Sequence, residues 1–317
     1  MRKTGIKLLL LLQVSTGMAQ TRMTDINTNG GSNPGQLSAV GNQLFFTATE
    51  SNFGTEPYVM DSLGNVLLVK DIRPAGGSGA FAYTEMNNAV YFLASPINGS
   101  TDLYKYESGT TVKINGTGSG IENSYQANED KITVYLNKLI FAYNDNSFNF
   151  GEELYQYNGI ANSISLLRNI NTGFFGSSPR DFITMNNVLY FTAISQTHGL
   201  ELWRYNGSSV ARISDLAPNS ANGLPLNSGI QTPRFVVFQN ELYFAGSSGS
   251  NGLFELYKYS GTGFPQVVPI NQKRFKQIHS FHIVNNSLVF TGLDSVFNQK
   301  LYQYDGSNPI QAISDTI

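Results

Sequence analysis

An internal repeat constrains the fold of this 317-residue chain more than any other feature of its sequence. Its first signature is an apolar–aromatic triplet that ends in Phe. The six copies of this triplet are Leu44–Phe46, Val90–Phe92, Leu139–Phe141, Leu189–Phe191, Leu242–Phe244 and Leu288–Phe290. The closing Phe recurs every 46 to 53 residues. A fixed period of about 20–50 residues indicates a solenoid, a propeller or a related repeat architecture.

A second signature follows each copy of the first. It consists of a polar residue, an apolar residue and an aromatic ring, and in five of the six copies the polar residue is an acid. The six copies are Glu56–Tyr58, Asp102–Tyr104, Glu153–Tyr155, Glu201–Trp203, Glu255–Tyr257 and Lys300–Tyr302. The ring follows the Phe of the first signature by 12 to 14 residues, which is the spacing of two antiparallel strands joined by a short loop. Each unit therefore contains a hairpin.

Turn residues add two further strands to each unit. Asn158-Gly159, Asn206-Gly207 and Asp305-Gly306 supply the positive φ angles that tight hairpin turns require. Short apolar segments follow the second signature at Val66–Ile72, Ile164–Ile170, Val210–Leu216 and Pro265–Ile270. Others precede the first signature at Phe182–Met185, Phe235–Phe238 and Phe281–Val284, closed by Asn186-Asn187, Gln239-Asn240 and Asn285-Asn286. The content of one unit is that of a four-stranded propeller blade.

The sequence thus predicts an all-β protein, a β-propeller with six four-stranded antiparallel blades. The composition agrees, because charged residues are 13%, aromatic residues 12% and glycines number 31, a mixture that favours strands and tight turns. We expect a single propeller domain over residues 20–317. Its units are predicted at 36–82, 83–130, 131–180, 181–229, 230–277 and 278–317.

The two ends of the chain leave a seven-bladed alternative open. Met23–Ile26, followed by Gly30-Gly31-Ser32, resembles the last strand of a unit, as in Val69–Ile72. The sixth unit has its own copy, Ile313-Ser314-Asp315. There is one strand too many for a simple ring of six, so either a seventh blade is incomplete in this chain or the extra strand packs elsewhere.

The first 19 residues are predicted to be a signal peptide. Arg2, Lys3 and Lys7 form a basic start, Leu8–Leu12 is an apolar run, and Gly17–Ala19 is a small-residue cleavage pattern. The apolar run is far shorter than the ~20 residues that span a bilayer, so we expect no membrane insertion. The predicted location is secreted or cell surface.

Charge and cysteine content exclude several classes of function. Removal of the signal peptide would change the formal net charge from −2 to −5, and no run of Lys and Arg interleaved with aromatics is present, so we expect no nucleic-acid binding. The chain has no cysteine, which excludes disulfides, thiolate catalysis and cysteine-type metal sites.

A family resemblance is carried by the segments His198–Gly207, Phe53–Tyr58 and Val69–Ser78. They resemble ELWxxDGT-repeat proteins, a family of exported bacterial proteins, and the resemblance extends over nearly all of the chain after residue 19. The fourth unit keeps the Glu-Leu-Trp triplet, and no unit keeps the complete Asp-Gly-Thr ending. The resemblance implies a propeller-like fold and a secreted or surface location; it implies no reaction and no catalytic residues.

No catalytic constellation is evident. The three histidines are His198, His279 and His282. His198 precedes a second signature, where we expect it to stabilise a turn, and His279 and His282 are three apart on a predicted strand, so they should point to opposite faces. The acids Asp102, Glu153, Glu201 and Glu255 recur once per unit, which predicts a structural role such as accepting backbone amides of a loop.

We expect no cofactor, although the loop Asn144–Asn149 carries oxygen atoms that calcium could use without forming an EF-hand pattern. The ring of each second signature is predicted to pack in the core. Less periodic aromatics in predicted loops are the candidate ligand-binding residues: Phe148, Phe150, Phe174, Phe175 and Phe297. The preferred patch is Asn171–Ser178.

These observations favour a non-enzymatic extracellular binding or adhesion module that recognises a glycan or a protein through its blade loops. One alternative is a carbohydrate-active or other hydrolase with a site at the propeller axis, which would need two carboxylates about 5 to 10 Å apart. Another is a structural segment of a longer surface protein.

Overall fold

The computed structural model describes residues 24–74, 76–97, 100–114, 132–144, 150–173, 175–217, 219–225, 234–248, 252–269, 274–294 and 296–313. Within these ranges the regular secondary structure consists of β-strands alone. The predicted residues Phe148 and Phe174, and Asp145–Asn149 of the calcium-like loop, lie outside the described residues.

The strands form six four-stranded antiparallel sheets, each built from four consecutive strands. Sheet 1 contains β1 (Gly35–Val40), β2 (Gln43–Glu50), β3 (Gly54–Met60) and β4 (Val66–Leu68). Sheet 2 contains β5 (Phe81–Met86), β6 (Ala89–Ile97), β7 (Ser100–Glu107) and β8 (Thr110–Lys113). Sheet 3 contains β9 (Ile132–Tyr135), β10 (Lys138–Asn144), β11 (Glu152–Asn158) and β12 (Ser163–Arg168).

The second half of the chain repeats this arrangement. Sheet 4 contains β13 (Arg180–Met185), β14 (Val188–Ser195), β15 (Gly199–Tyr205) and β16 (Val210–Arg212). Sheet 5 contains β17 (Phe235–Phe238), β18 (Glu241–Gly246), β19 (Glu255–Tyr259) and β20 (Gln266–Val267). Sheet 6 contains β21 (Phe275–Val284), β22 (Ser287–Asp294), β23 (Gln299–Tyr304) and β24 (Gln311–Ala312). The predicted all-β propeller architecture with six four-stranded units is confirmed.

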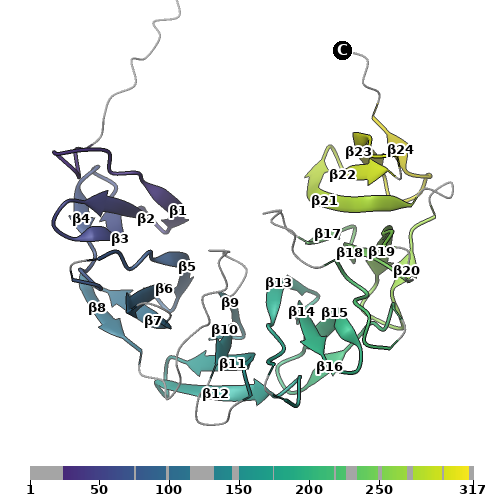
Figure 1. Ribbon diagram of the computed structural model, residues 1–317, viewed down its shortest axis with the longest axis horizontal. Coiled ribbons are helices and arrows are strands. Elements are labelled where there is room, and N and C mark those ends of the chain that lie inside the picture. Colours follow the sequence, from purple (N-terminus) through teal and green to yellow (C-terminus); the bar gives the residue numbers. More distant parts are fainter. Residues whose placement is uncertain are drawn as a thin grey trace, which may run out of the picture.

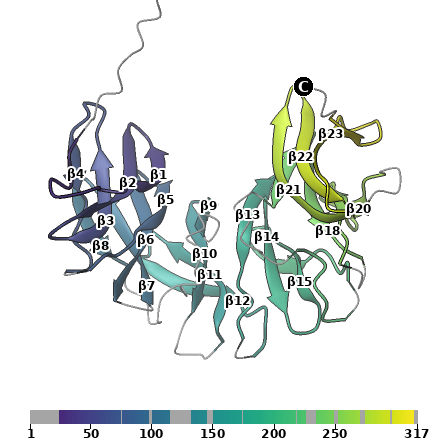
Figure 2. The same cartoon turned by 45° about the horizontal axis from the view of Figure 1, so that its top comes forward.

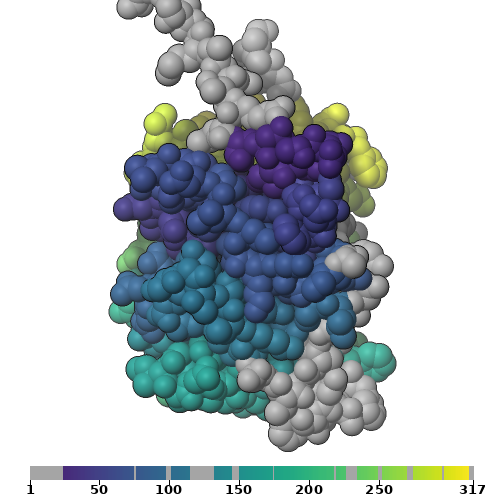
Figure 3. Space-filling model, turned by 90° about the vertical axis from the view of Figure 1, so that its left-hand side faces the viewer, coloured from purple at the N-terminus to yellow at the C-terminus, as the bar shows by residue number. Residues whose placement is uncertain are grey.

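The six sheets follow one another around a common axis in an open arc (Figure 1). The first strands of neighbouring sheets pack together in the order β1, β5, β9, β13, β17 and β21. Sheets 1 and 6 stand apart at the two ends of the arc, as the turned view in Figure 2 also shows. Seen from the side of sheet 1, sheets 1 and 2 form a continuous packed wall (Figure 3).

Each pair of neighbouring sheets encloses an apolar core to which both sheets contribute. The last two residues of the first signature pack in different cores, one on each face of their sheet. Tyr190 packs with Leu242 and Phe244 of the following sheet, while Phe191 packs with Ile140 and Leu154 of the preceding one. Both faces of an inner sheet are therefore buried, and each fully buried Phe contributes about 1.5–3 kcal/mol of transfer free energy.

The aromatic residue of the second signature is buried in all six sheets, as predicted. In four sheets it stacks on the Phe of the first signature at 5.6–6.0 Å between ring centroids, in the pairs Phe46–Tyr58, Phe92–Tyr104, Phe244–Tyr257 and Phe290–Tyr302. The stacking joins the second and third strands of the same sheet, so the two sequence signatures mark one packed hairpin.

Two-residue turns join the first and second strands, as predicted. Asn186 and Asn187 have φ angles of 51° and 59°, and Asn285 and Asn286 have 47° and 56°. Two successive positive φ angles characterise the type I′ turn, whose twist matches that of the flanking strands. The fourth strands are shorter than predicted. β16 ends at Arg212, because the chain then leaves the sheet edge to form the loop that leads to the next sheet.

The expectation for His279 and His282 is wrong. A β-bulge lies between them, with Ser280 at a φ of 58°. His279 pairs with Thr291 and His282 with Val289. These two partners are two residues apart on β22, so both histidines lie on the same face of sheet 6.

Candidate functional site

Because consecutive strands run in opposite directions, the connections between them lie alternately at the two ends of each sheet. The turns between second and third strands and the loops that lead from one sheet to the next lie at one end, which we call the loop face. The turns between first and second strands and between third and fourth strands lie at the other end, which we call the turn face. The predicted residues Phe150, Phe175 and Phe297 all lie on the loop face.

Buried glutamates hold the sheet-to-sheet loops in place. Glu56, at the start of β3, is fully buried. Its carboxylate accepts hydrogen bonds from the backbone N–H of Ile72 at 3.1 Å, of Arg73 at 3.3 Å and of Ser78 at 3.0 Å. The Ser78 hydroxyl donates a fourth bond at 2.5 Å. A glutamate of sheet 1 therefore fixes the loop from which sheet 2 begins. We call such a residue a clamp glutamate.

Glu153 repeats this clamp in sheet 3. Its carboxylate accepts from the N–H of Ile170 at 2.8 Å, from the N–H of Asn171 at 3.0 Å and from the Ser177 hydroxyl at 2.5 Å. The loop it holds lies between β12 and β13 and contains the predicted patch, Asn171–Ser178.

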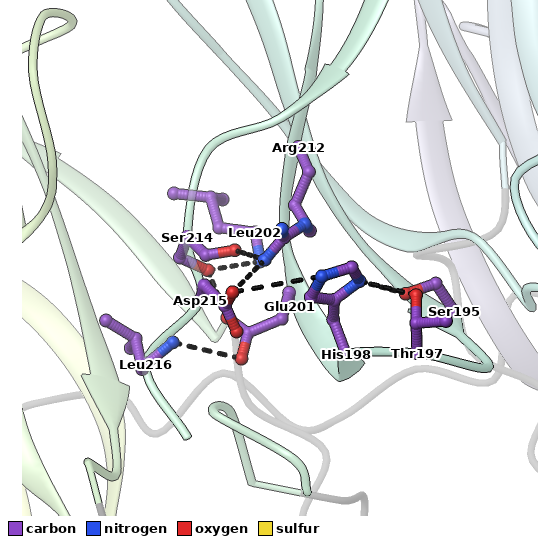
Figure 4. Close-up of polar contacts among 9 residues, drawn as sticks. All are labelled: Ser195, Thr197, His198, Glu201, Leu202, Arg212, Ser214, Asp215 and Leu216. Atoms are coloured by element: carbon purple, nitrogen blue, oxygen red, sulfur yellow. Dashed lines mark hydrogen bonds and ion pairs between the residues drawn. The ribbon is translucent and has the colours of Figure 1, made fainter. Parts of the chain in front are cut away.

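Glu201 repeats the clamp in sheet 4 with a different loop sequence. It accepts from the Leu216 N–H at 3.1 Å and from the Ser214 hydroxyl (Figure 4). The predicted structural role of the recurring acids is confirmed for Glu153 and Glu201.

Burial controls the protonation of the clamps. Loss of solvent raises the pKa of Glu153 to about 7 and that of Glu201 to about 6, against the opposing effect of the hydrogen bonds they accept. The pKa of Glu56 is raised for the same reason. Desolvation disfavours the charged carboxylate more than these donors stabilise it.

The other two recurring acids form ion pairs. Asp102 contacts the Lys113 Nζ at 2.7 Å, and Glu255 contacts the Arg274 Nε at 3.4 Å. Each contacts a half-exposed basic side chain, and the predicted acceptance of loop amides is not shown for these two acids. Lys300 occupies the equivalent position in sheet 6.

The aromatic candidates differ in exposure. Phe175 is 90% exposed and Phe297 is 71% exposed, whereas Phe150 is partly buried. An almost fully exposed Phe ring leaves a large apolar surface in water, and in a loop that surface is available to a ligand or partner.

The loop that carries Phe175 is braced from inside. The side-chain amide of the buried residue Asn171 donates to the carbonyl of Phe175 at 3.2 Å and to that of Gly176 at 2.9 Å. The Gly176 N–H donates to the Phe150 carbonyl at 3.2 Å. The Phe175 ring therefore projects from a backbone that is hydrogen-bonded at Phe175 itself and at the next residue, Gly176.

Phe297 is held in a similar manner by a turn. The Asp294 carboxylate accepts from the N–H of Val296 at 3.0 Å and of Asn298 at 2.8 Å, and the Phe297 N–H donates to the Asp294 carbonyl at 3.1 Å. The structure thus presents two exposed rings on hydrogen-bonded backbones of the loop face, one in the loop between sheets 3 and 4 and one in sheet 6.

His198 belongs to a polar chain on the loop face (Figure 4). Its Nδ1 lies 2.6 Å from the Thr197 hydroxyl, and its Nε2 lies 3.9 Å from the Asp215 carboxylate, which Arg212 contacts at 3.1 Å. A nucleophilic triad needs a hydrogen bond between the acid and the imidazole that orients the base, and 3.9 Å is too long for one. The contacts agree with the predicted turn-stabilising role.

A buried ionic cluster was not predicted from the sequence. Asp181, on the innermost strand of sheet 4, accepts a hydrogen bond from the Thr192 hydroxyl at 2.7 Å. It also contacts the Nε of Arg234 at 3.2 Å, just before β17. Neither residue recurs between units, so the repeat gives no signal for this contact. It joins sheets 4 and 5 near the axis.

Among the described residues, no group of three or more His, Cys, Asp or Glu side chains is arranged to hold a metal ion. The same residues contain no helix with the length and apolar character of a transmembrane span.

Comparisons with known proteins identify the fold. No family model and no curated protein sequence matches the chain. Among solved structures, it is similar to prolyl endopeptidases described in a study of two such enzymes, with a TM-score of 0.53 and 10% identity over 88% of this chain and 42% of theirs. A puromycin-hydrolyzing peptidase of Mycobacterium tuberculosis gives a TM-score of 0.53 and 8% identity over 88% of this chain and 43% of that one.

The chain spans less than half the length of these two peptidases. A lectin of Aleuria aurantia, solved with α-methyl-L-fucoside, gives a TM-score of 0.38 and 8% identity over 88% of this chain and 92% of that one. At 8–10% identity, the likeness to the two peptidases concerns the fold alone, and it agrees with a propeller-type repeat module.

Proposed function

We propose that this protein is an extracellular, non-enzymatic binding module that recognises a glycan or a protein through aromatic residues of its loop face. The observation that carries this proposal is the presentation of Phe175. Its ring is almost fully exposed, yet Asn171 and Glu153 fix the backbone on which it stands. A rigid, exposed ring loses little conformational entropy when a ligand covers it.

The chemistry of the site suits a shallow contact. An aromatic face can stack on the apolar face of a sugar ring or pack against an apolar side chain. Phe297 offers a second ring on the same loop face. The buried clamp glutamates are engaged by loop amides and hydroxyls, which gives them a structural role and supports binding over hydrolysis.

Export and family membership belong to the same proposal. The basic and apolar segment over residues 1–19 and the similarity to ELWxxDGT-repeat proteins support a secreted or surface location. Location can be tested by fractionating cells that produce the full chain and by sequencing the N-terminus of the exported form, which should begin at Gln20.

The ligand can be sought with a glycan array and with pull-down from extracellular material, using the exported chain. We expect binding at micromolar affinity or better. Phe175→Ala should then weaken binding about tenfold, which corresponds to about 1.4 kcal/mol. Phe264→Ala is the matched control, because Phe264 is 78% exposed and lies on the turn face.

Two results would contradict the proposal. One is that the chain binds no glycan and no protein at micromolar concentrations. The other is that Phe175→Ala and Phe264→Ala weaken binding equally, since this would place the ligand away from the loop face.

A further inference from the structure

The segment before sheet 1 has the sequence and the hydrogen bonds of a clamped loop. Asp25–Ser32 matches Asp71–Ser78 at five of eight positions. The Gly30 N–H donates to the Asn27 carbonyl at 3.2 Å, as the Gly76 N–H does to the Arg73 carbonyl at 3.0 Å. The carbonyls of Ser32 and Ser78 accept from the second strand of the sheet that follows, at 2.6 and 2.9 Å. We call Ile26–Ser32 the N-terminal loop.

Among the described residues, no carboxylate takes the place in the N-terminal loop that Glu56 takes in the matching loop. Around Glu56, the loop amides and the Ser78 hydroxyl converge on one carboxylate. In the described part of the chain, no carboxylate accepts a hydrogen bond from the N–H groups of Ile26 and Asn27 or from the Ser32 hydroxyl. Ser32 is partly exposed, whereas Ser78 is buried.

The apolar side of the N-terminal loop also follows the repeat. Ile72 packs in the core that contains Phe92 and Tyr104 of sheet 2, together with residues of sheet 1. Ile26 packs in the same way against Phe46 and Tyr58, on the face of sheet 1 that is turned away from sheet 2. Among the described residues, every other member of this cluster belongs to sheet 1.

At the other end of the arc, sheet 6 exposes an apolar residue that the inner sheets bury. The central apolar residue of the second signature is Leu103, Leu154, Leu202 and Leu256 in sheets 2 to 5, where it is at most 4% exposed. In each case it packs toward the next sheet. The equivalent residue of sheet 6, Leu301, is 50% exposed.

We propose that the open end of the arc is a docking site for three further antiparallel strands of the repeat's own type, supplied by a partner segment whose third strand carries a glutamate. The glutamate binds the N–H groups of the N-terminal loop and the Ser32 hydroxyl. One face of the docked strands covers the face of sheet 1 around Phe46, and the other covers Leu301. The arc thereby becomes a ring of seven units.

The recognition chemistry is specific. Converging N–H groups and a hydroxyl are all donors, so their complement is an acceptor-only group such as a carboxylate. The same donor arrangement takes a glutamate at Glu56 and at Glu153. The neighbouring apolar faces require docked strands that are apolar on both faces, as the inner sheets of this chain are.

The proposal can be tested with a full chain extended after Ile317 by a second copy of residues 175–205, which supplies β13–β15 with their glutamate. We expect the amides of Ile26–Ser32 to exchange at least tenfold more slowly in the extended chain, and its melting temperature to rise. Glu201→Ala made only in the appended copy should remove the protection of these amides. Ser32→Ala should reduce the protection while leaving the melting temperature of the unextended chain unchanged.

Unchanged exchange at Ile26–Ser32 in the extended chain would overturn the proposal, as would protection that survives Glu201→Ala in the appended copy. A second measurement covers an extension that fails to fold. The unextended chain is titrated with a cyclised hairpin of residues 188–205, and we expect saturable binding that the Glu201→Ala hairpin weakens at least tenfold. Equal affinity of the two hairpins would count against the proposal.

A second copy of this chain is the competing occupant. Light scattering of the unextended chain over a range of concentrations tests it. Dimer formation that protects Ile26–Ser32 from exchange would show that the open end binds another copy and would overturn the assignment to a glutamate-bearing partner segment.

Discussion

Two glycines set how closely the sheet-to-sheet loops approach the third strands. Gly54 and Gly199 each lie two residues before a clamp glutamate and have φ angles of 75° and 63°. A Cβ atom on Gly54 would lie 2.2 Å from the Gly76 carbonyl oxygen, and one on Gly199 would lie 2.4 Å from the Ala221 carbonyl oxygen. These positions need glycine both for their backbone conformation and for space.

Gly54→Ala should lower the free energy of unfolding by about 2–4 kcal/mol, because strain at a positive φ adds to a clash with backbone that cannot move aside. Gly64→Ala is the control. Gly64 also has a positive φ, of 86°, but nothing lies within 4 Å of an added Cβ, so its cost should be about 1–2 kcal/mol. Urea unfolding of both variants measures the difference, and equal losses would show that the loop does not press on β3.

The raised pKa of Glu153, about 7, makes stability depend on pH. The folded protein holds this proton more tightly than the unfolded chain, whose carboxyl titrates near 4.5. The stabilisation is therefore complete below about pH 4.5 and is lost as the pH rises toward 7. Glu201 contributes in the same direction with a pKa of about 6.

We expect the melting temperature to fall as the pH rises from 5 to 7.5. Glu153→Gln should make this fall smaller, whatever the substitution does to the melting temperature itself. Glu107→Gln changes the charge equally at an exposed ion pair with Lys105 and serves as the control. A pH slope that is the same in the Glu153→Gln variant and in the parent chain would contradict the assignment.

At the scale of strands and turns, most of the architecture could be predicted from the sequence, because the two signatures mark hairpins and the Asn-Asn pairs mark their turns. The bulges in the first strands could not. They place Gln36, Ala82, Asp181 and Ser280 at positive φ, and these four side chains share no size, charge or turn preference. The bulge is therefore imposed by tertiary packing around the axis and does not follow from local sequence propensity.

The candidate site divides in the same way. Phe175 and Phe297 could be selected because they fall outside the repeat, and the clamps because they fall within it. The hydrogen bonds from Asn171 and the contact of Asp181 with Arg234 could not be predicted. They depend on the relative positions of loops and sheets, which the spacing of residues in the sequence does not give.

The turn between β9 and β10 carries an unsuited residue. Leu136 has a φ of 48° and is exposed, and residues other than Gly, Asn and Asp lose about 1–2 kcal/mol in this conformation. Leu136→Asn should therefore raise the free energy of unfolding by up to about 1 kcal/mol. Leu63→Asn, at an exposed position with a negative φ, should change it little. Destabilisation by Leu136→Asn would mean that the leucine side chain makes a contact worth more than the strain.

At the scale of the whole molecule, the open arc predicts unequal stability along the chain. Sheets 2 to 5 are packed on both faces, whereas sheets 1 and 6 each have one neighbour. In repeat structures, stability is close to a sum over units and their interfaces. The terminal sheets should open at lower free energies than the central ones.

Trp203, the one tryptophan of the chain, lies in the core between sheets 3 and 4 and reports on the centre of the arc. Its indole N–H donates to the Ala193 carbonyl at 3.1 Å. We expect far-UV circular dichroism to decrease at lower urea concentrations than those that shift Trp203 fluorescence, and amides of β2 and β22 to exchange before those of β10 and β14. Coincident transitions by both probes would show that the arc unfolds as one cooperative unit.

A clamp glutamate and the loop it holds lie close together in the sequence, but the loop leads into the next sheet. The stretch of chain that must be inherited together therefore does not coincide with one sheet. A crossover at a turn such as Asn186-Asn187 keeps Glu201 and its loop on the same side of the breakpoint. A crossover within a sheet-to-sheet loop separates them. Genes that gain or lose blades should therefore recombine at the two-residue turns, and designers who wish to lengthen this scaffold would do well to splice there.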